Sequence, residues 1–456
     1  MLSWTPQLGT SGKPRYIEIA DAIEAAIRSG EFAAGDRLAP QRRMAERLGI
    51  DFTTVSRAYA EAQARGLVDS HVGRGTFVRG LGSGVDMPDP RRAREEDLSM
   101  NMPPEPDDPE LIARMREGLK AVSSNLVALL RYQSATGSEQ DKEAASSWLS
   151  MRGMVPRLDR VAVTPGAHVT MMAIFSTLAK PGDRVLCEAV TYAGLRGIAA
   201  RLGLQLVGLS SDGSGILTGA LDEAIRLHRP KALYLNPTLH NPTTLTIPQE
   251  RRMAIAEVLI AHRLPLIEDD AYGFIPPNAP TPFATLAPEL TWHIGGLAKC
   301  IGAGLRLAYT VAPDARAALA LGQALRAIAV MPAPLSIALA TRWIEDGTAD
   351  SIRRFVRAEA AARQEIAAEV LQGLDFAADR HAFNIWLKLP EGAGRAELMG
   401  RMAGRHVGLM PSDAFTVEGA PEERMRICLG GAIGREDLRA GLLILANRLQ
   451  DGGWVG

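Results

Sequence analysis

The chain has 456 residues, 46% of them hydrophobic and 23% charged, and its formal net charge is −1. These totals are typical of a globular protein of about two to four domains. They exclude an overall basic field, so any surface for nucleic acid must be a local patch. The three cysteines lie far apart without metal-ligand spacing, which argues against a disulfide framework or a zinc site. No apolar run reaches the ~18 residues of a membrane span and the start lacks signal-peptide features, so we expect a cytoplasmic protein.

The first 79 residues predict a small helical domain that ends in a hairpin. Residues 14–30 place apolar side chains at helical spacing, and Pro40 begins a short helix that Gly49 ends. A third helix is expected from about Thr53 to Arg65. Two short strand-like runs follow on either side of a glycine-rich turn, at residues 67–70 and 76–78. This order of helix, turn, helix and hairpin indicates a winged helix-turn-helix.

Arginines concentrate in this part of the chain. Residues 37–79 contain eight arginines against four acidic residues, a local balance of +4 in a chain of net charge −1. Such a patch is typical of a DNA-binding domain, because clustered cationic side chains neutralise backbone phosphates. Charge alone leaves one alternative open, a solvated basic face on a small helical domain.

Four short motifs occur in order in this region. They are Leu38-Ala-Pro-Gln-Arg-Arg-Met-Ala-Glu-Arg-Leu-Gly49, Thr53-Thr-Val-Ser-Arg-Ala-Tyr59, Gly66-Leu-Val and Gly73-Arg-Gly-Thr-Phe-Val78. Together they resemble the GntR family of bacterial regulators over residues 14–79. The sequence departs from the family at Asp51-Phe52, where a polar or basic residue is common, which leaves one base contact unassigned. We expect the helix 53–65 to enter the major groove of DNA. The expected DNA contacts are Arg42, Thr53, Thr54, Ser56, Arg57 and, in the wing, Gly73 and Arg74.

Residues 80–97 are rich in glycine, proline and charge and lack apolar periodicity. They predict a flexible linker between a domain at 1–79 and a domain at 98–456, with an ordered strap as the alternative. From about Leu98, strand-like runs alternate with helical patterns. This alternation predicts an α/β domain with a mostly parallel sheet and helices on both faces. The strand-like runs are 161–163, 184–187, 205–209, 232–235, 265–267, 292–294 and 307–311, and helices are expected at 167–179, 195–202 and 248–262.

Lys299 lies in an otherwise uncharged run of small and apolar residues that reaches Arg306. An ammonium group in such surroundings is poorly solvated, so its pKa should fall. A neutral lysine amine is the nucleophile that forms a Schiff base with an aldehyde cofactor. A surface lysine on a glycine-rich turn is the alternative that this stretch leaves open.

Several polar motifs follow predicted strands, at the edge where ligands bind in open α/β sheets. Thr164-Pro-Gly-Ala-His168 joins a strand to a helix, where free N–H groups suit a phosphate. Tyr192 can stack on a flat ring or can be a core tyrosine. Asn236-Pro-Thr-Leu-His-Asn-Pro-Thr243 brings amides to the next strand end. Leu266-Ile-Glu-Asp-Asp-Ala-Tyr272 brings acids that can hold a pyridinium nitrogen or cap a helix. Arg426, in an apolar strand-like run, needs an anion such as a carboxylate.

Together these motifs resemble the aspartate-aminotransferase fold of pyridoxal 5'-phosphate (PLP) enzymes, fold type I, over residues 98–456. The resemblance implies that Lys299 is the Schiff-base lysine and that Arg426 binds an amino acid's α-carboxylate. Tyr132 is similar to the tyrosine that reaches the phosphate of the partner subunit. The implied cofactor contacts are Asp269 on the ring nitrogen, Tyr272 and Asn241 on the ring hydroxyl, Tyr192 stacked on the ring, and Arg306 with the backbone of Gly166, Ala167 and His168 on the phosphate. The sequence departs from the family at Gly296 and Ala298, where serines are usual, and at Thr244, where a glycine is common.

A GntR-like head joined to an aminotransferase-like body resembles the MocR-type regulators. This resemblance implies a transcription regulator that binds operator DNA and PLP. The implied regulator senses either PLP itself or an amino acid or amine through an external aldimine. It also implies a homodimer in which each head lies over the body of the other subunit. Two alternatives stay open: a working aminotransferase with an inherited DNA-binding head, and a DNA-binding scaffold whose body holds no cofactor.

Overall fold

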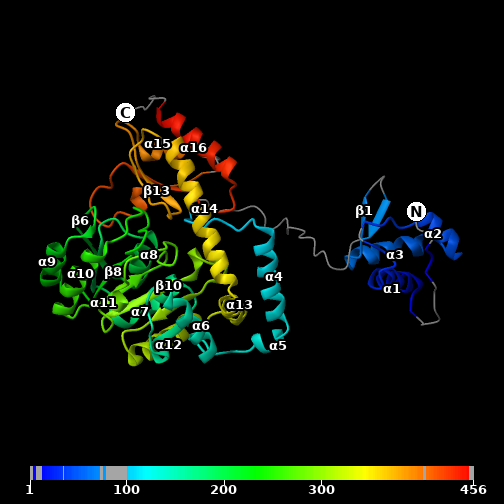
Figure 1. The fold of residues 1–456 in the computed structure, drawn as a ribbon, viewed down its shortest axis with the longest axis horizontal. Coiled ribbons are helices and arrows are strands. Elements are labelled where there is room, and N and C mark those ends of the chain that lie inside the picture. Colours follow the sequence, from blue (N-terminus) through cyan, green and yellow to red (C-terminus); the bar gives the residue numbers. More distant parts are fainter. Residues whose placement is uncertain are drawn as a thin grey trace. The chain divides into compact units, whose positions relative to one another are not determined.

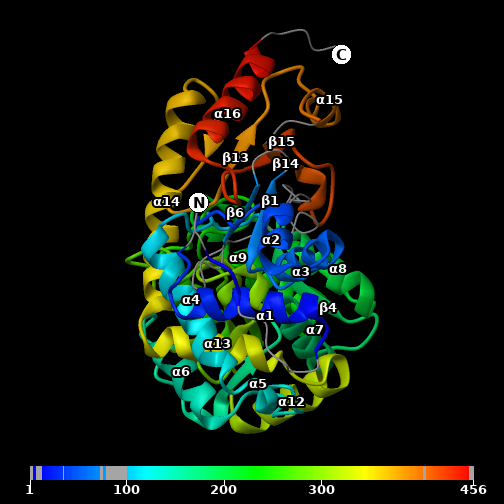
Figure 2. The ribbon, with the colours of Figure 1, turned by 90° about the vertical axis from the view of Figure 1, so that its right-hand side faces the viewer.

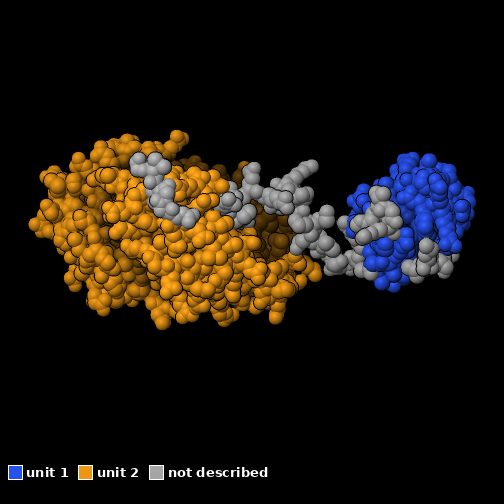
Figure 3. Space-filling view, turned by 90° about the horizontal axis from the view of Figure 1, so that it is seen from above, with its two compact units in different colours: residues 1–96 blue, residues 97–456 orange. Residues whose placement is uncertain are grey.

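The computed structural model describes residues 4–6, 13–33, 35–71, 75–78, 100–403 and 407–450. The chain divides into two compact units, residues 1–96 and 97–456, which Figure 3 shows in different colours. We call the first unit the head and the second the body, and each is described by itself. The predicted linker 80–97 and the predicted wing contacts Gly73 and Arg74 lie outside the described residues.

The described part of the head has the predicted order of helices and strands. The elements are α1 (Arg15–Arg28), α2 (Gln41–Leu48), α3 (Phe52–Ala64), β1 (Val68–His71) and β2 (Gly75–Val78), labelled in Figure 1 where there is room. Gly49 ends α2 with a left-handed φ of 62°, so the chain turns sharply toward α3. β1 and β2 pair antiparallel, with Val68 opposite Val78. The predicted winged helix-turn-helix is therefore confirmed for these residues.

The head has a hydrophobic core of its own. Ile19 and Ile23 of α1, Met44 of α2, and Val55 and Tyr59 of α3 are all buried in it. The Tyr59 hydroxyl donates a 2.8 Å hydrogen bond to a backbone carbonyl in the segment that precedes α2. This bond satisfies a buried hydroxyl and fixes α3 against the segment that precedes α2.

A seven-stranded sheet forms the centre of the body. Its order is β3-β11-β10-β9-β8-β4-β5, and neighbours pair in parallel except where β11 meets β10 and β3. Among the described residues, β11 is thus the one strand of this sheet that runs against the others, which confirms a mostly parallel sheet. The strands are β3 (Val161–Thr164), β4 (Arg184–Glu188), β5 (Gln205–Leu209), β8 (Ala232–Leu235), β9 (Leu266–Asp269), β10 (Thr291–Gly296) and β11 (Ala308–Val311).

Helices cover both faces of this sheet because the side chains of each strand alternate between the faces. Val185 and Cys187 of β4 pack in one cluster with α7, α8 and α12, whereas Leu186 packs on the other face with α9, α10 and α11. Val163 of β3 packs with α6, α13 and α14. The helices are α6 (Glu139–Ser150), α7 (Ala167–Leu178), α8 (Ala193–Leu202), α9 (Thr218–His228), α10 (Gln249–His262), α11 (Phe283–Leu286), α12 (Ala315–Ala329), α13 (Pro334–Glu345) and α14 (Thr348–Val370).

The carboxyl-terminal part of the body is built on a second, antiparallel sheet of order β12-β13-β15-β14. The long helix α14 leads from α13 to this sheet, and α16 packs beside it (Figures 1 and 2). The elements of this carboxyl-terminal part are β12 (Phe376–Ala377), β13 (Asn384–Lys388), α15 (Arg395–Arg401), β14 (Gly408–Pro411), η4 (Ser412–Ala414), β15 (Arg424–Cys428) and α16 (Arg435–Gln450). The remaining elements of the body are α4 (Pro109–Ser123), α5 (Leu126–Leu129), η1 (Leu158–Arg160), β6 (Ser211–Asp212), β7 (Gly215–Ile216), η2 (Leu297–Lys299) and η3 (Ala303–Leu305).

None of the described helices combines the length and the apolar character that a membrane crossing requires. Within the same residues, no group of three or more histidine, cysteine, aspartate or glutamate side chains is arranged to hold a metal ion. Cys187, Cys300 and Cys428 are all buried, and none of them forms a disulfide with another described residue.

Candidate cofactor site and DNA-binding face

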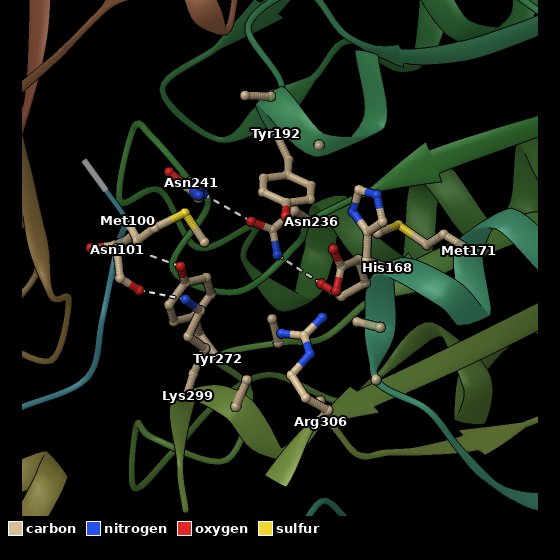
Figure 4. A pocket seen from close by; sticks show the side chains of 18 of the residues that line it. Met100, Asn101, His168, Met171, Tyr192, Asn236, Asn241, Tyr272, Lys299 and Arg306 are labelled. Atoms are coloured by element: carbon tan, nitrogen blue, oxygen red, sulfur yellow. Dashed lines mark hydrogen bonds between the residues drawn. The ribbon is translucent and has the colours of Figure 1, made fainter. Parts of the chain in front are cut away.

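A cavity of about 380 Å³ opens in the body where the predicted cofactor residues converge (Figure 4). It lies at the carboxyl ends of β3, β4, β8 and β9 and beside η2, because residues that directly follow these strands line it. Ten of the predicted residues line this cavity: Gly166, Ala167, His168, Tyr192, Asn241, Asp269, Tyr272, Lys299, Arg306 and Arg426. The structure thus gathers them in one place, while their individual roles stay predictions.

Lys299 ends the short helix η2 that follows β10, and its side chain points into the cavity (Figure 4). Its ammonium group donates a hydrogen bond to the backbone carbonyl of Asn101 and lies 6.0 Å from the centre of the Tyr272 ring. Burial, and then the nearby cation of Arg426, lower the pKa of Lys299 to about 8. A substantial fraction of this amine is therefore neutral near physiological pH, as a nucleophile requires.

Asp269 ends β9 and is only 5% exposed. Its Oδ2 accepts a 2.8 Å hydrogen bond from the Tyr234 hydroxyl, whereas its Oδ1 is buried without a hydrogen-bond partner among the described residues. Burial raises the pKa of Asp269 to about 6, so the group is still mostly ionised at pH 7. A buried carboxylate oxygen without a donor is costly. The protonated nitrogen of a pyridine ring in the cavity is a donor that fits this oxygen.

The start of α7 and Arg306 together form a site for an anion. Gly166 precedes α7 with a φ of 84°, and no side chain caps the helix. This left-handed φ is one that glycine adopts easily and other residues rarely do. Uncapped N–H groups beside a guanidinium suit a phosphate. Burial, and then Arg306, lower the pKa of His168, so its imidazole is neutral here. Gly296 and Ala298 line the same cavity without hydroxyl groups.

Asn236 is a site residue that the sequence analysis missed. Its side-chain amide donates a 2.7 Å hydrogen bond to the backbone carbonyl of Asp269 and accepts a 2.8 Å bond from the backbone N–H of Asn241 (Figure 4). Its own backbone N–H donates to the buried carboxylate of Glu188 at 2.9 Å. Asn236 therefore fixes the positions of two predicted cofactor residues. The sequence contained a signal for this residue, because Asn236 is the first residue of the Asn-Pro motif at 236–243.

Arg426 reaches the cavity from the second sheet, where β15 is paired on both sides. It is 3% exposed, and it donates a 2.9 Å hydrogen bond to the side-chain oxygen of Asn241. Its guanidinium carbon lies 5.1 Å from the centre of the Phe415 ring. These contacts hold a positive charge at the cavity wall beside a neutral amide, which suits the carboxylate of a ligand.

Asn101 is a second residue that the sequence analysis missed, and no motif marked it. Its side-chain amide donates to the Tyr272 hydroxyl at 2.9 Å and to Asn384 at 3.0 Å, while its carbonyl accepts from Lys299. It thus ties the beginning of the body to the lysine. Tyr234, the partner of Asp269, was missed as well because it lies within a fully buried strand.

Gly194 explains the position of Tyr192, the predicted ring contact, and the backbone of Thr244 explains how a threonine replaces the family's usual glycine. A Cβ atom at Gly194 would lie 2.3 Å from the Tyr192 ring, so only glycine allows this tyrosine to lie where it does. Thr244 has a φ of 63°, in the region that glycine adopts most easily, and its N–H donates to the His240 carbonyl at 2.6 Å. The turn therefore keeps a glycine-like conformation without a glycine.

Tyr132 does not line this cavity. It follows α5 and is 86% exposed, in a segment where Val127 and Leu130 are also exposed at 74% and 70%. A contact with a partner subunit stays a prediction.

In the head, Asp51 caps the predicted recognition helix α3. Its carboxylate accepts hydrogen bonds from the Thr54 N–H at 2.9 Å, the Thr54 hydroxyl at 2.6 Å and the Thr53 hydroxyl. These bonds, first that of Thr53 and then those of Thr54, hold the pKa of Asp51 well below its usual range. The hydroxyl protons of Thr53 and Thr54, two of the predicted DNA contacts, are therefore engaged within the protein. Arg57, on the same helix, is exposed, with its guanidinium 4.2 Å above the Tyr16 ring.

One arginine that was counted in the basic patch is paired with acidic residues of the head. Arg65 counts among its eight arginines, yet its guanidinium bonds to Asp21 at 2.6 Å and to Glu61 at 2.8 Å, with Glu24 at 3.4 Å. Its charge is thus already neutralised by three acids and is not available to phosphates. Arg42 on α2, by contrast, is exposed, as the predicted DNA contact requires.

Comparisons with known proteins match both parts of the chain. Residues 96–442 match the family model for aminotransferase class I and II, and residues 15–78 match the one for bacterial regulatory proteins of the gntR family. The chain is 27% identical over 453 residues to the HTH-type transcriptional regulator YdeF of Bacillus subtilis, covering 99% of this chain and 97% of YdeF.

Two further similarities are to a regulator and to an aminotransferase of known structure. Over 307 residues the chain is 26% identical to the vitamin B6 salvage pathway transcriptional repressor PtsJ of Salmonella typhimurium, covering 66% of this chain and 68% of PtsJ. The crystal structure of LysN, the α-aminoadipate aminotransferase of Thermus thermophilus, matches the fold with a TM-score of 0.69 at 23% identity. That match covers 78% of this chain and 92% of LysN, which was crystallised with N-(5'-phosphopyridoxyl)-L-leucine.

Proposed function

We propose that this chain, which belongs to the aminotransferase class I and II family and carries a gntR-family domain at residues 15–78, is a MocR-type transcription regulator that binds PLP. The head binds operator DNA, and the body senses a small molecule. One observation carries the role of the body: Lys299, Asp269 and Arg306 converge on one cavity of a size suited to a cofactor.

The residues of the cavity fit PLP group by group. Bound PLP supplies an aldehyde that reacts with primary amines. Lys299 would hold the aldehyde carbon, and Asp269 Oδ1, which is buried without a donor among the described residues, would accept a hydrogen bond from the protonated ring nitrogen. Tyr192 covers one face of the ring, held in place by the space that Gly194 leaves. Arg306 and the first turn of α7 bind the phosphate.

The effector is PLP itself or an amino acid or related amine that competes with Lys299 for the cofactor. Arg426 binds the carboxylate of such an amino acid, because it is a buried cation at the cavity wall. The ligand changes DNA binding only to the extent that it binds one arrangement of heads and bodies better than another. PtsJ is named a repressor of vitamin B6 salvage, which supports a cofactor-related effector.

The protein acts as a homodimer in which each head lies over the body of the other subunit. The support is the exposed apolar segment around Val127, Leu130 and Tyr132, which a monomer would leave in water. In the dimer, Tyr132 reaches the phosphate site of the partner. A dimer carries two heads, so its operator contains two half-sites, as direct or inverted repeats.

An active aminotransferase is the second candidate, and the lowered pKa of Lys299 beside Asp269 and Arg426 favours it. Turnover distinguishes the two. The protein with PLP is incubated with a panel of amino acids and 2-oxoglutarate, and new oxo acids are measured. Under the regulator proposal, oxo acids do not accumulate beyond the amount of protein, whereas sustained production favours the enzyme.

The regulator proposal is tested directly on DNA. Full-length protein with PLP is mixed with randomised duplexes, bound duplexes are selected, and the selected sequence is footprinted. We expect two protected half-sites per dimer, with the dimer mass confirmed by light scattering. A single short half-site, a monomer, or no selected duplex would contradict the proposal.

A further inference from the structure

Phe52 is the one large apolar side chain that is exposed among the described residues of the head. It is 46% exposed, while the other large apolar side chains among the described residues of the head are buried or partly buried. A phenylalanine held in water is unfavourable unless it serves a contact. Phe52 is the first residue of α3, the helix that we expect to enter the major groove of DNA.

The surroundings of Phe52 select nucleic acid over an apolar partner. The Arg42 guanidinium of α2 lies 5.9 Å from the centre of the Phe52 ring, and Arg43 and Arg57 are exposed on the same two helices. An apolar ring beside a cation complements a surface that carries phosphates around a groove lined with bases. In a helix-turn-helix, the first residues of the recognition helix contact base edges, while the preceding helix crosses the backbone.

The polar neighbours of Phe52 do not compete for this contact. The hydroxyls of Thr53 and Thr54 both donate to Asp51, so their protons are engaged in the cap of α3. The Phe52 ring has neither a hydrogen-bond donor nor an acceptor for the edges of guanine, adenine or cytosine. In the major groove, the C5 methyl group of thymine is the apolar feature that such a ring can contact.

We propose that Phe52 is a specificity-determining residue that packs against the C5 methyl group of a thymine in each operator half-site. The inference rests on the proposed DNA-binding function and adds a base identity to it. The inference also gives a role to Asp51-Phe52, where the sequence departs from the family pattern. At this position an apolar base contact would replace a polar one.

The test uses full-length protein with PLP and the duplex selected from random sequence. Each thymine is replaced in turn by uracil, which removes the methyl group and leaves the base-pairing edge intact. For the unsubstituted protein we expect one thymine per half-site at which uracil weakens binding about fourfold, the effect of one buried methyl group. Phe52→Ala should bind the thymine duplex about fourfold more weakly and no longer distinguish thymine from uracil there.

Two further variants separate an apolar contact from other roles. Phe52→Leu keeps an apolar side chain and should retain part of the thymine preference. Arg42→Ala should lower the salt dependence of binding by about one unit of slope, whereas Phe52→Ala should leave that slope unchanged. If a duplex is selected but no thymine responds to uracil, or if Phe52→Ala responds as the unsubstituted protein does, this inference alone is overturned. If no duplex is selected, the DNA-binding proposal is overturned with it.

Discussion

The cofactor cavity of the body and the DNA-binding face of the head are built in opposite ways. In the cavity, Asp269, Asn236 and Arg426 are buried and held by hydrogen bonds of 2.7–2.9 Å. On the head, Arg42 and Arg57 are exposed and rest on aromatic rings. A buried group that loses its partner bears the full cost of desolvation, whereas an exposed cation gains its contact only when DNA arrives. Changes in the cavity should therefore have larger effects than changes on the head.

The largest effect is expected at Lys299. Lys299→Ala removes the amine that attaches to PLP, so borohydride should no longer fix the cofactor to the protein. Mass spectrometry of PLP-loaded, borohydride-treated protein measures this as a complete loss of the added mass. Lys180→Ala, at an exposed lysine outside the cavity, is the matched control and should keep the label. A label that persists in Lys299→Ala, or that maps to another lysine, would show that the assignment is wrong.

The next effect is expected at Arg426. Truncating one partner of a buried charged contact costs about 2–5 kcal/mol, so Arg426→Ala should weaken amino acid binding about thirtyfold or more and leave PLP binding nearly intact. Calorimetry or spectral titration of the PLP-loaded protein measures both. Arg424→Ala, on the same strand but bonded to the exposed Glu422, should change neither. Equal amino acid affinity in Arg426→Ala and in the unsubstituted protein would argue against the role.

The pKa of Lys299 gives a pH dependence. The ammonium form cannot attack an aldehyde, and below a pKa of about 8 the neutral fraction falls tenfold per pH unit. The rate of PLP attachment should therefore rise about fiftyfold from pH 6 to pH 8 and level off above pH 9. Stopped-flow absorbance measures the rate. A rate that continues to rise to pH 10, as for an ordinary lysine, would contradict the lowered pKa.

A smaller effect is expected one contact away from the ligand. Tyr234→Phe removes the hydrogen bond that the Tyr234 hydroxyl donates to Asp269 Oδ2. A hydrogen bond to a charged group contributes about 1.5–3 kcal/mol, so PLP affinity should fall about tenfold or more. Equilibrium dialysis measures the affinity, and Tyr309→Phe, at another buried tyrosine outside the cavity lining, is the control. Similar PLP affinities for the two variants would show that Tyr234 does not contribute to PLP binding.

The smallest effects are expected on the head. Arg57→Ala should weaken DNA binding and lower its salt slope by about one if the arginine contacts a phosphate. Arg65→Gln should leave the slope unchanged, because Asp21 and Glu61 already neutralise Arg65. Titrations of the selected duplex across salt concentrations measure both. A drop in slope for Arg65→Gln equal to that for Arg57→Ala would mean that the basic patch acts as one diffuse charge.

The sequence predicted those parts of the molecule whose signal is local. Lys299 stood out in an uncharged run, and Asp269 and Asn241 followed buried strands, so the parallel sheet brought them to one edge. Asn101 and Tyr234 could not be predicted, because their importance lies in partners 171 and 35 residues away in the chain. The same limit applies to Arg65, which the sequence assigned to the basic patch although Asp21, 44 residues away, binds it.

The central claim is that a ligand in the Lys299 cavity changes how the heads bind DNA. The most direct test measures the affinity of full-length protein for its selected duplex without PLP, with PLP, and with PLP and an amino acid panel. We predict that at least one of these ligands changes the affinity of the unsubstituted protein and that Lys299→Ala does not respond. Identical affinities under every condition, together with sustained conversion of the amino acids to oxo acids, would contradict a sensor and identify an aminotransferase.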